Sequence, residues 1–474
     1  MKTLTFRNKI GYAIGDMANM ASFGMSATFL LVYYVDILGI TAAAAGTLFL
    51  IARIWDGIND PMMGAFADKL FSKHQGKGDK FKPFILRGCW ILGVASILMF
   101  WSPEGLSDGQ TLAWAYLTYI TWGMAYTFVN IPFGSVASVM TQDPEERASL
   151  SAFRSLGGVV GSALCKFVVP VILAMYADNL ETGYLIAMVS LSGFAIFGHL
   201  FAYSSIKENV KSTVSNQSVS AWQALKAIPK NKPLMCVSFA SFLMLLAMFT
   251  LGSVLMFYIK ENLDNALWVM SITGVIDLVI IVLMALVLPK MVAKLGTKDL
   301  MMKSALIVIM TSGIAFFLSS NAYIFLVFYS LMMFGIMIPI AAVWGQVSDC
   351  IDYNEYLTGN RQEGIIYASY SLMRKVGGAG AGFIAALGVS IIGYDPSLPS
   401  QSELTQQGLQ FLIFGFPSIA FIGVYLLYKK LWILDPETYQ KVIQANKKAT
   451  DKNQSTADIS NDKQSPITDN AVNA

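Results

Sequence analysis

Long apolar stretches alternate with short polar ones along almost the whole chain. About twelve of them are long enough, at roughly 18 to 25 residues, to cross about 30 Å of hydrocarbon as a helix. They lie near residues 12–38, 42–66, 84–102, 113–140, 152–176, 183–204, 234–258, 267–289, 300–319, 322–347, 364–392 and 408–432. The pattern therefore predicts an all-α integral membrane protein.

The composition agrees with a membrane protein and excludes an ordinary soluble one. Of the 474 residues, 55% are hydrophobic and 13% are charged, and the mean hydropathy is +0.56. The net charge of +3 comes from short loops and gives no reason to expect nucleic acid as a partner. The four cysteines lack the spacing of metal ligands, so we expect neither a disulfide framework nor a bound metal. No cleavable signal peptide is expected, because "MKTLTFRNK" leads into a full-length first span.

Basic residues gather in alternate loops. The loops after the second, sixth and eighth stretches are rich in Lys, whereas the segments 103–112, 177–183 and 393–407 contain neither Lys nor Arg. Positively charged loops of membrane proteins face the cytoplasm. We therefore expect both termini to be cytoplasmic, which agrees with an even number of spans.

The polar segment 205–233 divides the predicted spans six and six. Two six-helix bundles around a midplane cavity form the major-facilitator fold, which is the fold we expect. The predicted parts are an N-terminal bundle (1–204), a cytoplasmic linker (205–233), a C-terminal bundle (234–432) and a cytoplasmic, mostly disordered tail (433–474). An internal echo supports two related halves, since "NIPFG" in the fourth stretch matches "MIPIA" in the tenth.

The second stretch carries a charged cluster, "RIWDGINDPMMGAFADK", that contains Arg53, Asp56, Asn59 and Asp60. Their spacing places them on one side of a helix. Three charges at the bilayer centre would cost roughly 7 to 10 kcal/mol if they were unpaired. One interpretation is a structural Arg53–Asp56 ion pair, with Asp60 near water. The other is that Asp56 and Asp60, with the Asn59 amide, bind a monovalent cation or share a proton.

Other polar side chains are predicted inside the membrane. They are Asp16 and Asn19 in the first stretch, Thr127 and Asn130 in the fourth, Arg154 in the fifth, and Arg374 and Lys375 in the eleventh. Lys375 lies about ten residues into its span, deep enough to need an anion. A role in coupling and a snorkelling or simply ion-paired lysine both remain open.

Aromatic residues suggest a sugar site. Trp122 and Tyr126 lie on the fourth stretch and Trp344 on the tenth, at some depth in the membrane. An aromatic ring can stack on the C–H face of a sugar while Asn, Asp and Arg groups bind its hydroxyls. The alternative for each ring is the interfacial belt that aromatic side chains form in membrane proteins.

An acidic cluster, "SDCIDYNEY", follows the tenth stretch. With "RQEG" it suggests a gate of charge pairs that closes the inner face, and an ordinary solvated loop is the competing interpretation. The candidate gating residues are Asp349, Asp352, Glu355 and Arg361.

Several motifs occur together and in order over about residues 6 to 432. "KIGYAIGDMAN", "FLIARIWDGINDPMMGAFADK" with the following "GKGDKFKPFIL", "TWGMAYTFVNIPFG" and "SDCIDYNEY" resemble the glycoside-pentoside-hexuronide:cation symporter family of the major facilitator superfamily. The resemblance implies Na⁺-, Li⁺- or H⁺-coupled uptake of a glycoside or related sugar across a bacterial inner membrane. By position it implies cation-site roles for Asp56, Asn59, Asp60 and Thr127, and it matches Arg154 and Lys375 to basic residues of the family.

Three positions depart from the melibiose-type pattern of this family. Met20 and Asn130 stand where that pattern has sugar-binding aspartates, and Gly134 stands where it has a tryptophan. An α-galactoside is therefore not the expected substrate, although Asp16, Asn19 and Asn130 could form a different hydroxyl-binding set. We assign Trp122, Tyr126, Arg154 and Trp344 to the same sugar site, and coupling roles to Arg53 and Lys375.

The sequence thus predicts a secondary active transporter rather than an enzyme. Its expected partners are a sugar or glycoside, a monovalent cation and the lipid bilayer, and it is expected to act as a monomer without a cofactor. No G-x-x-x-x-G-K-[ST] loop for a nucleotide is present. A proton-coupled sugar efflux carrier is one alternative. A polytopic membrane enzyme or sensor is another.

Overall fold

The computed structural model describes residues 4–73, 79–141, 143–209, 226, 228–319, 321–359, 362–446 and 448. Eighteen side chains within these helices lie outside the description, including that of Asp60 and most of those between residues 60 and 73. The first half contains α1 (Phe6–Val32) with its π-helical extension η1 (Tyr33–Ile37), α2 (Ala42–Lys73), α3 (Lys82–Met99), α4 (Asp108–Met140), α5 (Pro144–Met175) and α6 (Leu180–Ser205).

The second half begins with the short helix η2 (Ile228–Lys230). It continues with α8 (Lys232–Asn262), α9 (Leu267–Leu295), α10 (Thr297–Leu318), α11 (Ala322–Thr358) and α12 (Glu363–Ile391), and with α13 (Glu403–Gln410), η3 (Phe411–Gly415) and α14 (Phe416–Leu431), which form one rod. Residues 436–446 form a further helical segment. The predicted tail beyond residue 446 and most of the predicted linker lie outside the described residues.

Among the described helices, ten are long and apolar enough to cross a membrane. Helices α2 and α4 have 32 and 33 residues and are therefore also long enough to cross a membrane. They carry several polar side chains. Together these elements give the predicted all-α fold of about twelve transmembrane helices. One prediction is too short, because the tenth span was expected to end near residue 347 and α11 continues to Thr358. The acidic cluster of "SDCIDYNEY" therefore lies on a helix.

Local capping explains where several helices begin and end. The Asn231 side chain accepts a hydrogen bond from the Leu234 N–H at the start of α8, and Asn321 accepts one from Ile324 at the start of α11. Gly359 ends α11 with a φ of +69°, a conformation that favours glycine. These caps satisfy backbone groups that have no partner inside the helix.

The two halves are two groups of helices that contact each other at one end of the molecule. The contacts run between α1 and α8, α2 and α12, and α5 and α9. They involve the later parts of α1, α5, α8 and α12 and the earlier parts of α2 and α9, as when Ser253 Oγ donates to the carbonyl of Ala27. Because successive spans run in opposite directions, all these segments lie at the end that contains η1, which we call the closed end.

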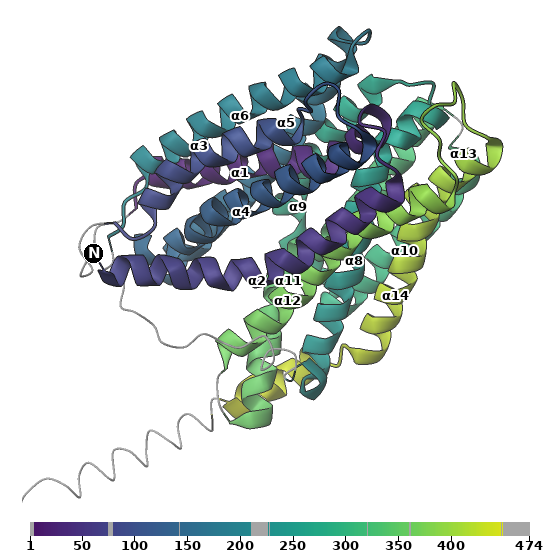
Figure 1. Cartoon of the computed structure of the whole chain (residues 1–474). Coiled ribbons are helices and arrows are strands. Elements are labelled where there is room, and N and C mark those ends of the chain that lie inside the picture. Colours follow the sequence, from purple (N-terminus) through teal and green to yellow (C-terminus); the bar gives the residue numbers. More distant parts are fainter. Residues whose placement is uncertain are drawn as a thin grey trace, which may run out of the picture.

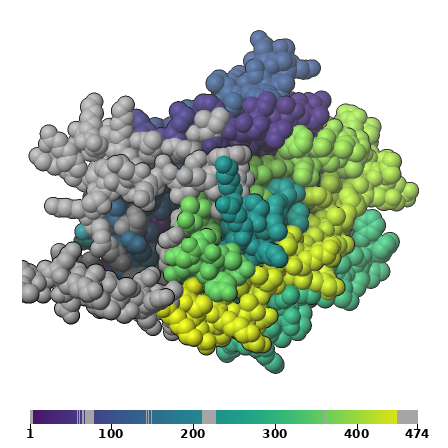
Figure 2. Space-filling view, turned by 90° about the horizontal axis from the view of Figure 1, so that it is seen from below, coloured from purple at the N-terminus to yellow at the C-terminus, as the bar shows by residue number. Residues whose placement is uncertain are grey.

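At the opposite end, where α1 begins, the two groups diverge (Figure 1). Figure 2 shows a hollow on this side, beside the green segments of α11 and α12. We call this the open end. The arrangement leaves a central space that both halves can line.

Candidate functional site

The charged cluster of α2 lies beside a cavity between the two halves. Arg53 Nη1 donates to Asp56 Oδ2 over 3.2 Å, and the guanidinium carbon lies 5.7 Å from the centre of the Phe23 ring. Both charged side chains are about one quarter exposed. Gly123 of α4 makes room for the carboxylate, because a Cβ there would come within 3.2 Å of Asp56 Oδ1. The predicted Arg53–Asp56 contact is thus present, and its carboxylate also faces α4.

The remaining cation-site candidates surround this pair. Thr127 is buried on α4, one helical turn after Gly123, and therefore lies on the side of α4 that faces Asp56. Asn59 is half-buried, and its amide nitrogen has no hydrogen-bond partner within the described structure. The Asp60 side chain lies outside the described residues, so its predicted part in the site stays a prediction.

The cavity at this site has a volume of about 30 Å³. Arg53 reaches it from α2, Phe23 and Ser26 from α1, and Phe249 and Gly378 from the second half. This volume holds one or two water-sized groups. It could hold a small ion, but a sugar needs the wider space toward the open end.

A second ion pair joins α1 to α5. Arg154 Nε donates to Asp16 Oδ1 over 3.0 Å. The guanidinium also lies over the Phe133 ring, at 5.8 Å, and Tyr12 stacks on that ring with centroids 4.9 Å apart. Two residues predicted for one sugar site therefore contact each other directly. Asn130 is half-buried on α4.

Asn19 lies in a different environment from Asp16. It is fully buried, and its Oδ1 is 3.1 Å from Nε2 of His199 on α6. The side chain thus points into the interior of the first half. In this conformation it does not line the space between the halves.

The candidate aromatic residues divide into a buried set and an exposed set. Trp122 is 2% exposed, and its Nε1 donates to Ser22 Oγ over 2.8 Å. Its ring stacks on the half-buried Tyr126, with centroids 5.6 Å apart. Trp344, by contrast, is 45% exposed and stacks on Tyr367 of α12 at 5.9 Å. In this conformation the Trp344 ring is accessible and the Trp122 ring is not.

The coupling candidate Lys375 lies near the middle of α12, and the gating candidates lie toward the open end. Lys375 is exposed on α12. Asp349, Asp352 and Glu355 follow one another at intervals of three on α11. Tyr439 donates to Asp352 Oδ2 over 2.9 Å, so the helical segment 436–446 is attached to this cluster. Arg361, the predicted basic partner, lies outside the described residues.

Sequence reasoning missed an ion pair between the halves, inside the membrane. Lys166 Nζ of α5 lies 2.6 Å from Asp277 Oδ2 of α9, and Tyr329 of α11 donates to Asp277 Oδ1 over 3.1 Å. Asp277 is the one charged residue of the predicted stretch 267–289, and Lys166 shares the stretch 152–176 only with Arg154, which is the signal that could have identified them. Which lysine meets which aspartate depends on how the helices are arranged.

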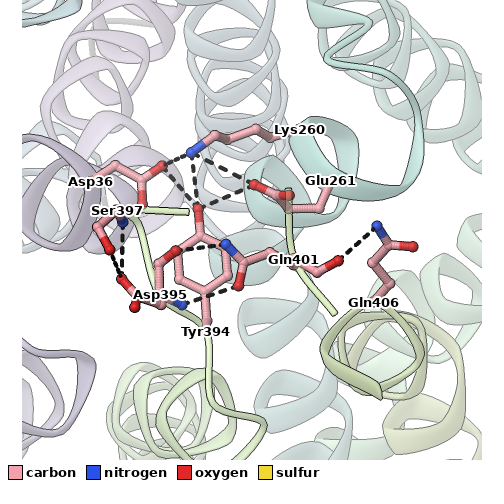
Figure 3. A network of polar contacts seen from close by, with 8 residues as sticks. All are labelled: Asp36, Lys260, Glu261, Tyr394, Asp395, Ser397, Gln401 and Gln406. Atoms are coloured by element: carbon pink, nitrogen blue, oxygen red, sulfur yellow. Dashed lines mark hydrogen bonds and ion pairs between the residues drawn. The ribbon is translucent and has the colours of Figure 1, made fainter. Parts of the chain in front are cut away.

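A second missed network closes the molecule at its closed end (Figure 3). Lys260 Nζ of α8 lies 2.7 Å from Asp36 Oδ2 of η1 and 3.7 Å from Glu261 Oε1. The Tyr394 hydroxyl lies 3.0 Å from Lys260 Nζ and donates to Asp36 Oδ2 over 3.2 Å. Burial and the nearby carboxylates of Asp36 and Glu261 raise the pKa of Tyr394, so its hydroxyl keeps its proton. The network therefore links the two halves at neutral pH.

Comparison with known proteins identifies the chain. The family model described as MFS/sugar transport protein matches residues 11–432. The chain belongs to this family of membrane transporters. The transporter is 32% identical over 447 residues to a Bacillus subtilis strain 168 protein named "Uncharacterized symporter YjmB", and the match covers 94% of this chain and 95% of that protein.

Two further relatives come from Escherichia coli strain K12. The transporter is 31% identical to a glucuronide carrier protein homolog, over 89% of this chain and 92% of that one. It is 28% identical to a protein that carries the name of a 2,3-dihydroxypropane-1-sulfonate exporter, over 93% and 95% of the two chains.

A solved structure supports the fold. The crystal structure of the nucleoside transporter NupG superimposes with a TM-score of 0.63 at 15% sequence identity, over 90% of this chain and all of the other. At this level of identity the likeness concerns the major-facilitator fold alone.

Proposed function

We propose that the transporter carries a sugar or glycoside into the cell together with Na⁺ or H⁺, by alternating access. The observation that carries this proposal is the position of Asp56, a carboxylate held by Arg53 beside a cavity that both halves line. A carboxylate at this depth is costly unless it is neutralised. A cation that enters the cavity could share Asp56 with Arg53, and Thr127 offers a further oxygen on the facing side of α4.

Coupling follows if the cation changes the balance between two conformations. In the present conformation the halves meet at the closed end, through Lys260 with Asp36 and through Lys166 with Asp277. If the termini are cytoplasmic, as the loop charges predict, this conformation faces inward. Neutralising the α2 cluster would lower the cost of rearranging the halves around it.

The membrane potential can supply enough energy for this transport. One charge that crosses 100 mV releases about 2.3 kcal/mol, which sustains a solute gradient of roughly fiftyfold. A cation gradient adds to this value. No nucleotide is needed.

The sugar site in this proposal lies on the open side of the cavity. The exposed rings of Trp344 and Tyr367 belong to the second half, and the Asp16–Arg154 pair offers polar groups from the first. The relative described as a glucuronide carrier protein homolog favours a sugar derivative as the solute. The name of the symporter relative favours cation coupling.

Uptake by the purified protein in liposomes tests the proposal. Labelled glucose, xylose, methyl glucoside and glucuronate would be offered under an imposed Na⁺ gradient, an imposed pH gradient, or neither. Accumulation of at least one sugar that requires one of the gradients is the expected result. Accumulation of the same size without a gradient would contradict symport.

Export is the second candidate, because one relative carries the name of an exporter. Liposomes preloaded with the same sugars distinguish the two directions. An efflux that an opposing cation gradient accelerates would favour cation-coupled export. An import that runs with the cation gradient favours uptake.

A further inference from the structure

Arg374 differs from the other intramembrane basic residues of the central space. It is the twelfth residue of α12 (Glu363–Ile391), and therefore lies about 17 Å along the helix, near mid-membrane. Four other basic side chains in the spans have carboxylate partners: Arg53 has Asp56, Arg154 has Asp16, Lys166 has Asp277 and Lys260 has Asp36. Among the side chains that the structure describes, no carboxylate pairs with Arg374.

Arg374 is held by aromatic rings instead. Its guanidinium carbon lies 5.6 Å from the centre of the Trp344 ring and 5.7 Å from that of Tyr370. Such contacts favour the charge of the guanidinium. Its interaction with the Tyr370 hydroxyl uses only part of its five N–H donors, so others remain for a ligand. Tyr370 is itself buried, and therefore forms a rigid support for the charge.

The helical register directs Arg374 toward the space between the halves. Gly378 and Gly382 line the central cavity, and Arg374 precedes Gly378 by one turn on the same face. Tyr367, two turns earlier, interacts electrostatically with Tyr12 on α1 of the other half. The side chain thus lies on the stripe of α12 that faces the first half.

The rings beside Arg374 are exposed. Trp344 is 45% exposed and Tyr367 is 52% exposed, and their planes lie at 17° to each other. Flat aromatic faces can cover the apolar side of a pyranose ring. The Arg374 guanidinium lies over the Trp344 ring, so a sugar bound beside these exposed rings could place a substituent within its reach.

We propose that Arg374 binds the acidic substituent of the solute, so that the transporter selects a sugar with a carboxylate or sulfonate group over its neutral counterpart. The inference rests on the proposed function and names the substrate class of that site. A planar guanidinium can donate two parallel hydrogen bonds to a carboxylate or sulfonate. Arg374 is half-buried and has no carboxylate partner among the described side chains, so an anionic solute gains from a site that already contains its counter-charge.

Binding to the full-length protein in detergent tests the inference with matched probes. Methyl β-D-glucuronide and methyl β-D-glucoside differ only at C6, where a carboxylate replaces a hydroxymethyl group. A third probe with a sulfonate at C6 separates the two acids. The variants are Arg374→Gln and Arg374→Lys, and Arg87→Gln on the exposed side of α3 is the matched control.

Binding of at least one acidic probe at least tenfold tighter than the glucoside is the expected result. Arg374→Gln should remove this preference and leave glucoside affinity within threefold, whereas Arg374→Lys should keep part of it and Arg87→Gln all of it. Equal binding of the three probes, or a preference that survives in Arg374→Gln, would overturn the inference. Thermal unfolding of each variant confirms that a lost affinity is not lost folding.

The outcome also separates this inference from the proposed function. Gradient-driven uptake that is equal for the neutral and the acidic sugars, and that Arg374→Gln changes for neither, would overturn the acid site and leave sugar symport in place. Tight binding of an acidic probe without gradient-driven uptake would support the acid site and contradict symport.

Discussion

Lys166 Nζ lies 2.6 Å from Asp277 Oδ2, across the boundary between the two halves and inside the membrane-spanning part of the molecule. Both side chains are largely buried, and Tyr329 adds a hydrogen bond to the carboxylate. Removing one partner of a buried ion pair leaves an uncompensated charge, at a cost of about 3 to 5 kcal/mol. The pair therefore holds α5 against α9 in the present conformation.

Asp277→Asn should consequently lower the thermal unfolding temperature, because Lys166 loses its counter-charge. The double variant Lys166→Met with Asp277→Asn contains no unpaired charge and should recover most of the loss. Thermal unfolding of the purified proteins in detergent measures both. A double variant no more stable than Asp277→Asn would argue against the ion pair as the cause.

The network around Lys260 allows a prediction about conformation. Lys260→Gln should weaken the link between η1 and α8 and let the closed end separate more often. A cysteine introduced at Phe249, which lines the cavity, should then react several times faster with an impermeant maleimide applied from the closed end. The four native cysteines are buried and give a low background.

Lys441→Gln is the matched control. Lys441 forms an exposed ion pair with Glu437, and both residues are far in sequence from Lys260. It should leave the labelling rate unchanged.

Because the pKa of Tyr394 is raised above its ordinary value of 10, its hydroxyl stays neutral between about pH 6 and 9. Ionisation of Tyr394 therefore cannot explain any change of labelling in this range. A labelling rate that Lys260→Gln does not alter would contradict the gating role.

Asp56→Asn tests the cation site. The change removes the charge that a cation would neutralise, so accumulation driven by a gradient should fall to background, whereas exchange of labelled for unlabelled sugar should persist. Uptake and exchange in liposomes measure the two steps separately. Asp79→Asn, at a partly exposed pair with Lys82, should affect neither. Normal accumulation by Asp56→Asn would remove this carboxylate from the coupling mechanism.

The positions of the helices could be predicted closely from the sequence. Apolar length and loop charge are local properties, and α9 begins at Leu267, the residue at which its stretch was predicted to start. The end of α11 was misplaced because polar residues after 347 still form a helix, which stops only at the αL conformation of Gly359. Hydropathy reports where the membrane ends, not where the helix does.

The rotation of each helix could not be predicted in the same way. A transmembrane helix is apolar on most of its surface, so its sequence does not state which face meets lipid, another helix or the central space. Asn19 and Trp122 are for this reason directed into the first half rather than toward the second. The Arg53–Asp56 contact was predictable because both residues lie on one helix at a spacing of three.

The contrast between Trp122 and Trp344 gives a last prediction. Trp122 is 2% exposed and hydrogen-bonded to Ser22, so Trp122→Ala should remove packing and lower stability by about 3 to 5 kcal/mol. Trp344 is 45% exposed, so Trp344→Ala should change the unfolding temperature little and weaken sugar binding by tenfold or more. Thermal unfolding without ligand and equilibrium binding of methyl β-D-glucuronide separate the two effects. A Trp344→Ala protein that binds normally would show that the exposed ring serves the membrane interface instead, since an interfacial ring has no contact with the solute.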